Sequence, residues 1–338
     1  MSSATEPAGT GEGRLGAALL AALVVAATLG AALWPLAPEH TLEPAVAALA
    51  PPGARFDLLR LADGRTLAAE RIERVAHGFR LHAGGAAREI PEASVDADRP
   101  IGEVRFWLGS DRFGRDVAAR TLHGARLSLA VAAAAVAVAL GFGVPFGLAA
   151  GLARGGAARG LLALLETAQA FPRLFLVVAL AAVVPPHPAT TILILGSTGW
   201  MPVARLVRAE ARKIAASDYV LAARAIGASP LRIAFRHVLP GALAPVGVES
   251  AFAMAGAIAG EAALSFLGLG APPPVASWGG LIADGRDVLV AAPWISVAPG
   301  VALALTVLAC TCSRSARASD SIRGGRRWPA ELVAPAAS

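Results

Sequence analysis

The ionisable side chains of this 338-residue chain do not form a pattern typical of catalysis or metal binding. His123 and His187 are isolated, and no paired carboxylates or Ser/His/Asp set support acid–base or nucleophilic chemistry. Lys213 is the only lysine and is followed by Ile214, so the chain lacks the Gly-Lys-Ser/Thr of a phosphate-binding loop. We therefore expect no catalytic residues, no metal and no cofactor bound by this chain.

Charged residues that can pair with one another lie in two polar stretches. Asp111, Arg115 and Asp116 form a cluster that favours a salt-bridged cap, with docking of another protein as the alternative. Asp284 and Trp278 belong to a later polar loop and are candidates for the same surface. The chemistry these residues indicate is ion pairing and protein recognition.

A third polar stretch, DYVLAARAIGASPLRIAFRHVLP (218–240), predicts a hairpin of two helices. The first helix is expected from about Asp218 to Ile226, with Ser217 as its N-cap. Gly227 permits the left-handed turn that ends this helix. Arg224 and other arginines make the segment polar, and its defined shape indicates a docking element.

The second helix of this hairpin is expected to start at the N-cap and N1 pair Ser229-Pro230 and to stop at Pro240. Its spacing places Leu231, Phe235 and Val238 on one face. Arg232 and Arg236 lie one turn apart on another face. Two roles are possible for them: contact with acidic residues of a partner, or only a contribution of positive charge that determines the membrane topology.

The composition indicates that these polar stretches connect membrane spans. The chain is 56% hydrophobic and 16% charged, with a mean hydropathy of +0.60. The net charge of +6 does not indicate nucleic-acid binding, because many arginines flank apolar segments. We predict six spans that are about 20 residues long, at 15–36, 127–151, 161–184, 189–207, 243–267 and 292–312. The run 15–36 is too long for a signal-peptide core, so we expect a retained span.

The distribution of arginines predicts the orientation. They gather in the 152–160 connection, around segment 209–240 and after the last span, whereas the connection at 185–188 has none. The positive-inside rule then places the N-terminus (1–14), segment 209–240 and the basic tail (313–338) in the cytoplasm. Cys310 and Cys312 close the last span and, two residues apart on a helix, do not face each other.

Three carboxylates fall within or near spans, where charge is costly. Glu166 and Glu249 are expected near the cytoplasmic ends of their spans. Glu261 lies deeper, where it either lines a translocation path or caps a partner helix.

Segment 37–108 is predicted to be external, with a small β-rich domain at about 55–95. Apolar and polar residues alternate there in short runs, and Asp63-Gly64, His77-Gly78 and Gly84-Gly85 supply turns. We expect a small antiparallel sheet of about four strands, similar to an SH3-like barrel.

The 218–240 segment resembles the coupling segment of inner-membrane permeases of ATP-binding cassette (ABC) importers. That family has Glu-Ala-Ala, a Gly four residues later and a Leu-Pro pair. The positions that fit are Ala222, Ala223, Gly227, Leu239 and Pro240, while Leu221 replaces the usual Glu.

Two further stretches resemble the permeases for dipeptides, oligopeptides and nickel. LGSDRFGRDVAARTLHGARLSL (108–129) is similar to the lead-in to their second span, and GEAALSFLGLGAPPPVASWGGLIADGRD (260–287) to the end of span five and its loop. The resemblance covers residues 100–312 and is to the C-type permease of a heterodimeric importer.

This resemblance implies an all-α polytopic fold of the type I ABC importer permease class, with a permease domain at 109–312, in the bacterial inner membrane. The implied partners are membrane lipid, a second homologous permease, two ATPases that bind ATP and Mg²⁺, and an external solute-binding protein. It implies short peptides as solute; nickel or another small solute, and more remotely a membrane sensor using the β domain, are the alternatives. The implied ATPase-coupling residues are Asp218, Ala222, Ala223, Arg224, Gly227, Ser229, Arg232, Leu239 and Pro240.

Overall fold

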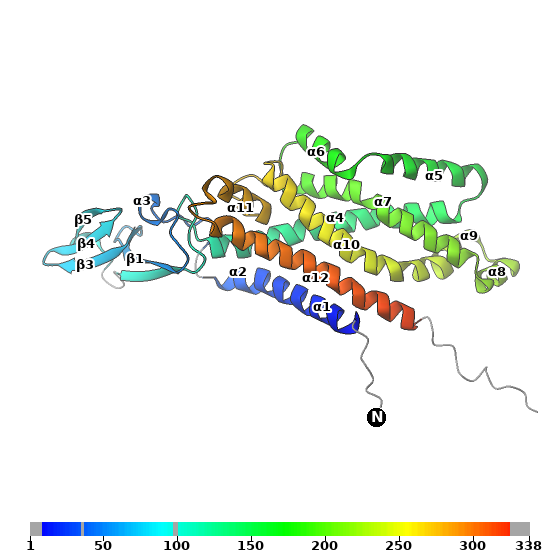
Figure 1. Cartoon of the computed structure of the whole chain (residues 1–338), viewed down its shortest axis with the longest axis horizontal. Coiled ribbons are helices and arrows are strands. Elements are labelled where there is room, and N and C mark those ends of the chain that lie inside the picture. Colours follow the sequence, from blue (N-terminus) through cyan, green and yellow to red (C-terminus); the bar gives the residue numbers. More distant parts are fainter. Residues whose placement is uncertain (1–8, 35–36, 97–100, 325–338) are drawn as a thin grey trace, which may run out of the picture. The chain divides into compact units, whose positions relative to one another are not determined.

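The computed structural model describes residues 9–34, 37–96 and 101–324, and the side chains among them except those of 9–14 and 313–324 (Figure 1). Most of the predicted terminal segments 1–14 and 313–338 therefore lie outside the described residues. The chain forms two compact units. Within the described ranges, one contains residues 131–260 with 9–22 and 305–324, and the other contains 23–34, 37–96, 101–130 and 261–304.

Five helical segments in the described ranges are long and apolar enough to cross a membrane. They are Leu15–Leu33 (α1, Gly9–Val25, continued by η1, Ala26–Gly30, and α2, Ala31–Leu33), α4 (Val117–Leu152), α7 (Pro188–Ala215), Pro230–Phe266, and Trp294–Cys312 of α12 (Trp294–Gly324). Several of these helices extend beyond the predicted spans, since polar turns at their ends continue the helix. The start of α4 at Val117, instead of at 127, is an example.

The predicted third span, 161–184, is a bent pair of helices. α5 (Gly155–Ala170) and α6 (Arg173–Val183) meet at an angle of 78°. The break falls at Phe171-Pro172, because proline lacks an amide hydrogen and disfavours helical geometry in the residue before it. If this pair is one span, the described residues contain the predicted six.

The prediction that Pro240 stops a helix is wrong. α9 (Pro230–Arg232) passes through the π-helical η3 (Ile233–Val238) into α10 (Leu239–Phe266) without interruption. In η3 the Leu239 amide donates to the carbonyl of Ala234, five residues back. This wider turn shifts the hydrogen-bond register just before the proline, which then lies in the first turn of α10.

Small residues allow α4 and α7 to pack closely in the first unit. A Cβ atom at Gly147 of α4 would lie only 2.5 Å from the carbonyl oxygen of Ala204 in α7. On α7, a Cβ at Gly196 would lie 2.6 Å from the Cβ of Val138. Close backbone approach through glycine is a common way for helices to associate in a membrane.

The second unit contains the expected β-rich insertion, but it has more strands than predicted. The strands are β1 (Ala54–Arg60), β2 (Thr66–Ala69), β3 (Arg71–Val75), β4 (Gly78–Ala83), β5 (Ala86–Pro91) and β6 (Ile101–Phe106). They form two antiparallel sheets, β2-β1-β6 and β3-β4-β5, rather than one sheet of four strands. Sequence periodicity missed β6 because the long 91–101 connection separates it from its partner β1.

The insertion has an apolar core of its own. The rings of Phe56 and Phe106 meet edge to face at 5.5 Å between β1 and β6, and Leu59, Phe79 and Leu81 are buried beside the second sheet. The predicted turns are present, with φ of +84° at Gly64. The unit also contains α3 (Pro44–Ala47), α11 (Trp278–Gly285) and the short 3₁₀ turns η2 (Glu92–Ser94) and η4 (Arg286–Val288).

Candidate functional site

The first candidate site is the helix α8 (Asp218–Ala225), which ends in a complete Schellman motif. The amide of Ala228 donates to the carbonyl of Ala223, and the amide of Gly227 donates to that of Arg224, both at 3.0 Å. Gly227 has φ of +88°, which L-residues adopt at a cost. No atom lies within 4 Å of a Cβ built at Gly227, so the requirement for glycine here is conformational rather than steric.

The start of α8 differs from the prediction in one respect. Ser217 holds the N-cap position, but its hydroxyl donates backwards to the carbonyl of Ile214 at 2.6 Å and does not cap α8. Its side chain therefore closes the end of α7, while Asp218 supplies negative charge in the first turn of α8.

The second helix starts as predicted. The Ser229 hydroxyl accepts a hydrogen bond from the Arg232 amide at 3.3 Å, and Pro230 follows at the first helical position. Val238, however, is fully buried, whereas Leu231 and Phe235 are exposed. The predicted common face of these three residues is wrong, because the π-helical turn of η3 rotates Val238 away from a regular helical position.

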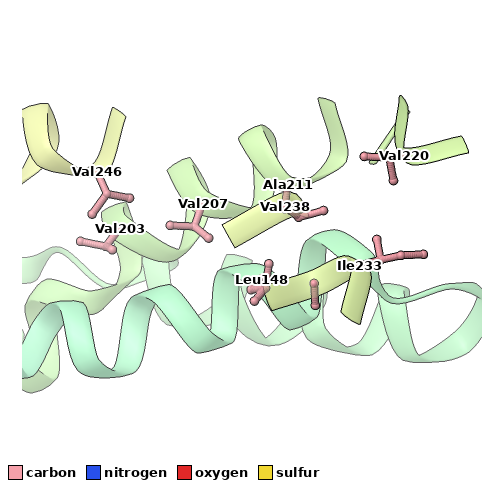
Figure 2. Packing of buried hydrophobic residues seen from close by; sticks show 9 residues of the cluster. Leu148, Val203, Val207, Ala211, Val220, Ile233, Val238 and Val246 are labelled. Carbon is pink, nitrogen blue, oxygen red and sulfur yellow. The ribbon is translucent and has the colours of Figure 1, made fainter. Parts of the chain in front are cut away.

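A hydrophobic core joins α8 to three helices (Figure 2). Val220 of α8 is fully buried with Ile233 and Val238 of η3, and Val207 of α7 belongs to the same cluster. Leu148 brings α4 into it. Because interiors are close-packed and transmit strain, a displacement of α8 passes to α7 and to the helix that continues into α10.

The outer side of this hairpin carries an exposed apolar surface. Ile226 is 87% exposed, and Leu221 is 46% exposed. The predicted coupling residues Asp218, Ala222, Gly227, Ser229, Arg232 and Pro240 are also exposed, whereas Ala223, Arg224 and Leu239 are partly buried. The sequence analysis did not predict Ile226 as a surface residue of this site. The signal that could have indicated it was an isoleucine directly before the glycine of a polar hairpin. We call the exposed residues of 218–232 the coupling surface.

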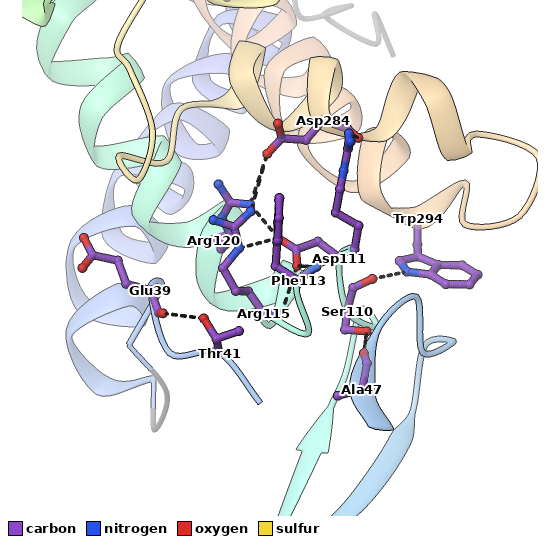
Figure 3. A network of polar contacts seen from close by, with 11 residues as sticks. Glu39, Thr41, Ala47, Ser110, Asp111, Phe113, Arg115, Arg120, Asp284 and Trp294 are labelled. Atoms are coloured by element: carbon purple, nitrogen blue, oxygen red, sulfur yellow. Dashed lines mark hydrogen bonds and ion pairs between the residues drawn. The ribbon is translucent and has the colours of Figure 1, made fainter. Parts of the chain in front are cut away.

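The second candidate site is a buried ion-pair network (Figure 3). The Asp111 carboxylate is 2.6 Å from Nε of Arg115 and 2.7 Å from Nη1 of Arg120. Asp284 reaches Arg120 at 3.2 Å and Arg115 at 3.8 Å. The amides of Phe113 and Arg115 also donate to Asp111. The predicted meeting of Asp111, Arg115 and Asp284 therefore occurs, and it supports the reading as a salt-bridged cap.

Arg120 is a central member that sequence reasoning missed. Its side chain is only 4% exposed, in the first turns of α4. The available signal was an arginine near the start of a long and mostly apolar helix, where an unpaired charge is costly.

Two residues predicted for this surface do not belong to it. Asp116 accepts hydrogen bonds from Nε1 of Trp34 at 2.7 Å and from the Ala118 amide at 2.9 Å, so it caps α4. Burial raises the pKa of Asp116, although these hydrogen bonds oppose the shift. Trp278 is 1% exposed and donates through Nε1 to the carbonyl of Thr121, so it cannot contact a docking protein.

The network is also connected to the segment that precedes the β strands. The Ser110 hydroxyl donates to the carbonyl of Ala47 and accepts from the Ala50 amide, and the Leu49 amide donates to the carbonyl of Asp111. A depression of about 500 Å³ lies over Arg115 and Asp284. This combination provides a rigid, charged surface that can recognise a protein or a polar solute.

Among the described residues, Glu261 makes no hydrogen bond to another helix, so its predicted role as a path residue or a cap stays a prediction. It is 2% exposed, and its Oε1 accepts from the hydroxyl of Ser265 one turn later on α10, at 2.7 Å. Its Oε2 has no hydrogen-bond partner among the described residues. The same part of the chain contains no group of three or more His, Cys, Asp and Glu side chains that could hold a metal. The arrangement at both sites thus supports binding and mechanical contact.

Comparisons with known proteins agree with this interpretation. The family model for the inner membrane component of binding-protein-dependent transport systems matches residues 143–315. A putative peptide transport system permease protein of Brucella suis is 43% identical over 202 residues, covering 60% of this chain and 68% of the relative. The di/tripeptide transport system permease protein DppC of Pseudomonas aeruginosa is 38% identical, covering 62% and 69%.

A solved structure of the MetNI methionine ABC transporter in an inward-facing conformation shares the fold. It aligns with a TM-score of 0.51 at 18% identity, covering 62% of this chain and 97% of that chain. Together with the apolar helices, these matches show that the chain belongs to the family of inner membrane permease components of binding-protein-dependent ABC transport systems and is a multi-pass membrane protein.

Proposed function

We propose that this chain forms half of the translocation pathway of an importer for short peptides and is driven by ATPases on separate polypeptides. The observation that carries the proposal is the coupling surface, an exposed patch held rigidly by the core around Val220. The names of the relatives support peptides as the solute, since the matching permeases of Brucella suis and Pseudomonas aeruginosa are both named for peptide transport.

In this mechanism an ATPase subunit contacts the coupling surface and moves it during ATP-driven closure. α7 and the helix from Pro230 to Phe266 then act as levers, because both pack on α8. The partners are two such ATPases, a second homologous permease and a solute-binding protein. The termini and the coupling surface lie in the cytoplasm, in line with the positive-inside rule. The Asp111–Arg120–Asp284 network stabilises the external surface on which the solute-binding protein docks.

Reconstitution of the importer tests this function. We expect proteoliposomes that contain this chain, its second permease, the ATPases and the solute-binding protein to accumulate radiolabelled dialanine and trialanine when ATP is supplied to the ATPase side. Vesicles that contain this chain alone should accumulate neither peptide. ATP-driven uptake by the chain alone, or a complete importer that moves no peptide, would contradict the proposal.

A further inference from the structure

A cavity of about 90 Å³ lies within the first unit, between α4, α6, α7 and α10. Its wall is built mainly from apolar or small residues, among them Ala139, Gly199 and Phe252. These residues lie well inside α4, α7 and the long helix that ends at Phe266, far from the helix termini. The cavity therefore lies at an intermediate depth of the helices and has room for several water molecules.

Two charged side chains of opposite sign line this cavity. Arg173 comes from the first turn of α6, and Glu249 lies in the middle of the Pro230–Phe266 helix. This helix begins at Pro230, before the predicted start of the span at 243, so the predicted position of Glu249 near the cytoplasmic end of its span stays a prediction. Arg173 was not among the predicted site residues, although it directly follows the helix-breaking Phe171-Pro172.

The guanidinium of Arg173 extends to two glycines on neighbouring helices. A Cβ atom at Gly199 of α7 would lie 3.6 Å from Nη2, and one at Gly256 of α10 would lie 3.7 Å from Nη1. Because both positions are glycine, neither contributes a side chain that would cover the guanidinium. Within the part of the chain that the structure describes, neither Arg173 nor Glu249 has an ion-pair or side-chain hydrogen-bond partner.

Helix stability does not explain the charge of Arg173. A cation in the first turn of α6 faces the positive end of the helix dipole. Unpaired charges within membrane helices are costly and usually face water, protein or a substrate path. The cavity thus presents one free cation and one free anion on a surface that must be hydrated or occupied.

We propose that Arg173 and Glu249 are contacts for the charged end groups of a short peptide during its passage, an inference that rests on the proposed function. The planar guanidinium of Arg173 suits the carboxylate of the peptide, and the carboxylate of Glu249 suits its ammonium group. A site of this kind must bind weakly enough to release its solute, and a single charged group for each end satisfies that need.

Dialanine uptake by the complete reconstituted importer tests this inference. We expect Arg173→Gln and Glu249→Gln each to lower the uptake rate about tenfold or more, as expected for the loss of a charge-assisted contact. The yield of assembled complex and the ATP hydrolysis stimulated by the liganded binding protein should stay unchanged. The charge-preserving variants Arg173→Lys and Glu249→Asp should recover most of the uptake.

Matched controls come from α5, where Arg159 and Glu166 are exposed and lie outside the cavity. Arg159→Gln and Glu166→Gln should import dialanine like the wild type. Unchanged uptake by the cavity variants, or a loss accompanied by poor assembly, would overturn the assignment while leaving wild-type peptide import, and thus the proposed function, intact. Failure of the wild type to import either peptide would instead refute the proposed function itself.

Discussion

At the residue scale, the charged side chains of the ion-pair network and those of the cavity are arranged in two different ways. Asp111 receives two guanidinium groups and two backbone amides, so its charge is satisfied within the protein. Arg173 and Glu249 lack such partners in the described structure. The first arrangement stabilises the fold, whereas the second leaves charge available to a solute.

Removing the acceptor of the satisfied network should therefore destabilise the protein. Asp111→Asn leaves Arg120 buried with only the half-exposed Asp284 as an anionic partner, and we expect a loss of about 3 kcal/mol. The measurement is the denaturant-induced unfolding of the purified protein in detergent.

The control for this prediction is Glu103→Gln, which breaks the exposed Arg55–Glu103 pair in the same unit. Its effect should be at most about 1 kcal/mol. If both variants lost the same free energy of unfolding, the buried Asp111 network would contribute no more stability than an exposed ion pair.

At the element scale, function depends on how the short helix α8 is terminated and held. Its last turn ends in the Schellman motif at Gly227, and its inner face is fixed by Val220. The following helix is continuous into α10 because the π-helical turn of η3 accommodates Pro240. A short helix linked in this way can transmit displacement without dissociating from its neighbours.

Gly227→Ala should weaken this coupling. Alanine at φ of +88° costs about 1–2 kcal/mol, so the last turn of α8 should open and the coupling surface should lose its shape. We expect severalfold slower peptide uptake by the reconstituted importer, with normal membrane insertion. Gly227→Asn should be milder, since asparagine tolerates left-handed geometry better.

Gly160→Ala provides the matched control, because Gly160 lies in the regular helix α5 with open space around a Cβ atom. This substitution should leave uptake unchanged. Wild-type uptake by Gly227→Ala would remove the coupling role from this turn.

At the scale of the whole molecule, the β-rich insertion and the coupling surface belong to different units and are assigned to opposite sides of the membrane. This orientation is a prediction that follows from the arginine distribution. The insertion has its own core and hydrogen bonds to the Asp111 network, which indicates a folded module.

Labelling with a membrane-impermeant maleimide tests the orientation. We expect a cysteine at Arg65, exposed in the β1–β2 turn, to react on the outside of intact spheroplasts. A cysteine at Ile226 should react only in inside-out vesicles. Both variants are made after replacement of Cys310 and Cys312 by serine. Reaction of position 226 in intact spheroplasts would refute the cytoplasmic assignment.

The sequence by itself determined the helical membrane class, the β-rich insertion and the start and left-handed turn of the coupling hairpin. These features depend on local physics: apolar length, the missing amide of proline and the conformational freedom of glycine. The resemblance to known permeases then indicated the family.

Only the tertiary structure decided which side chains meet. It brought Arg120 to Asp111 and Asp284, buried Trp278, moved Val238 away from Phe235, and placed Arg173 and Glu249 on one cavity. Such contacts join residues that are distant in sequence, and their partners depend on helix rotation and on π-helical register. Local periodicity carries no information about either, because both result from close packing between helices.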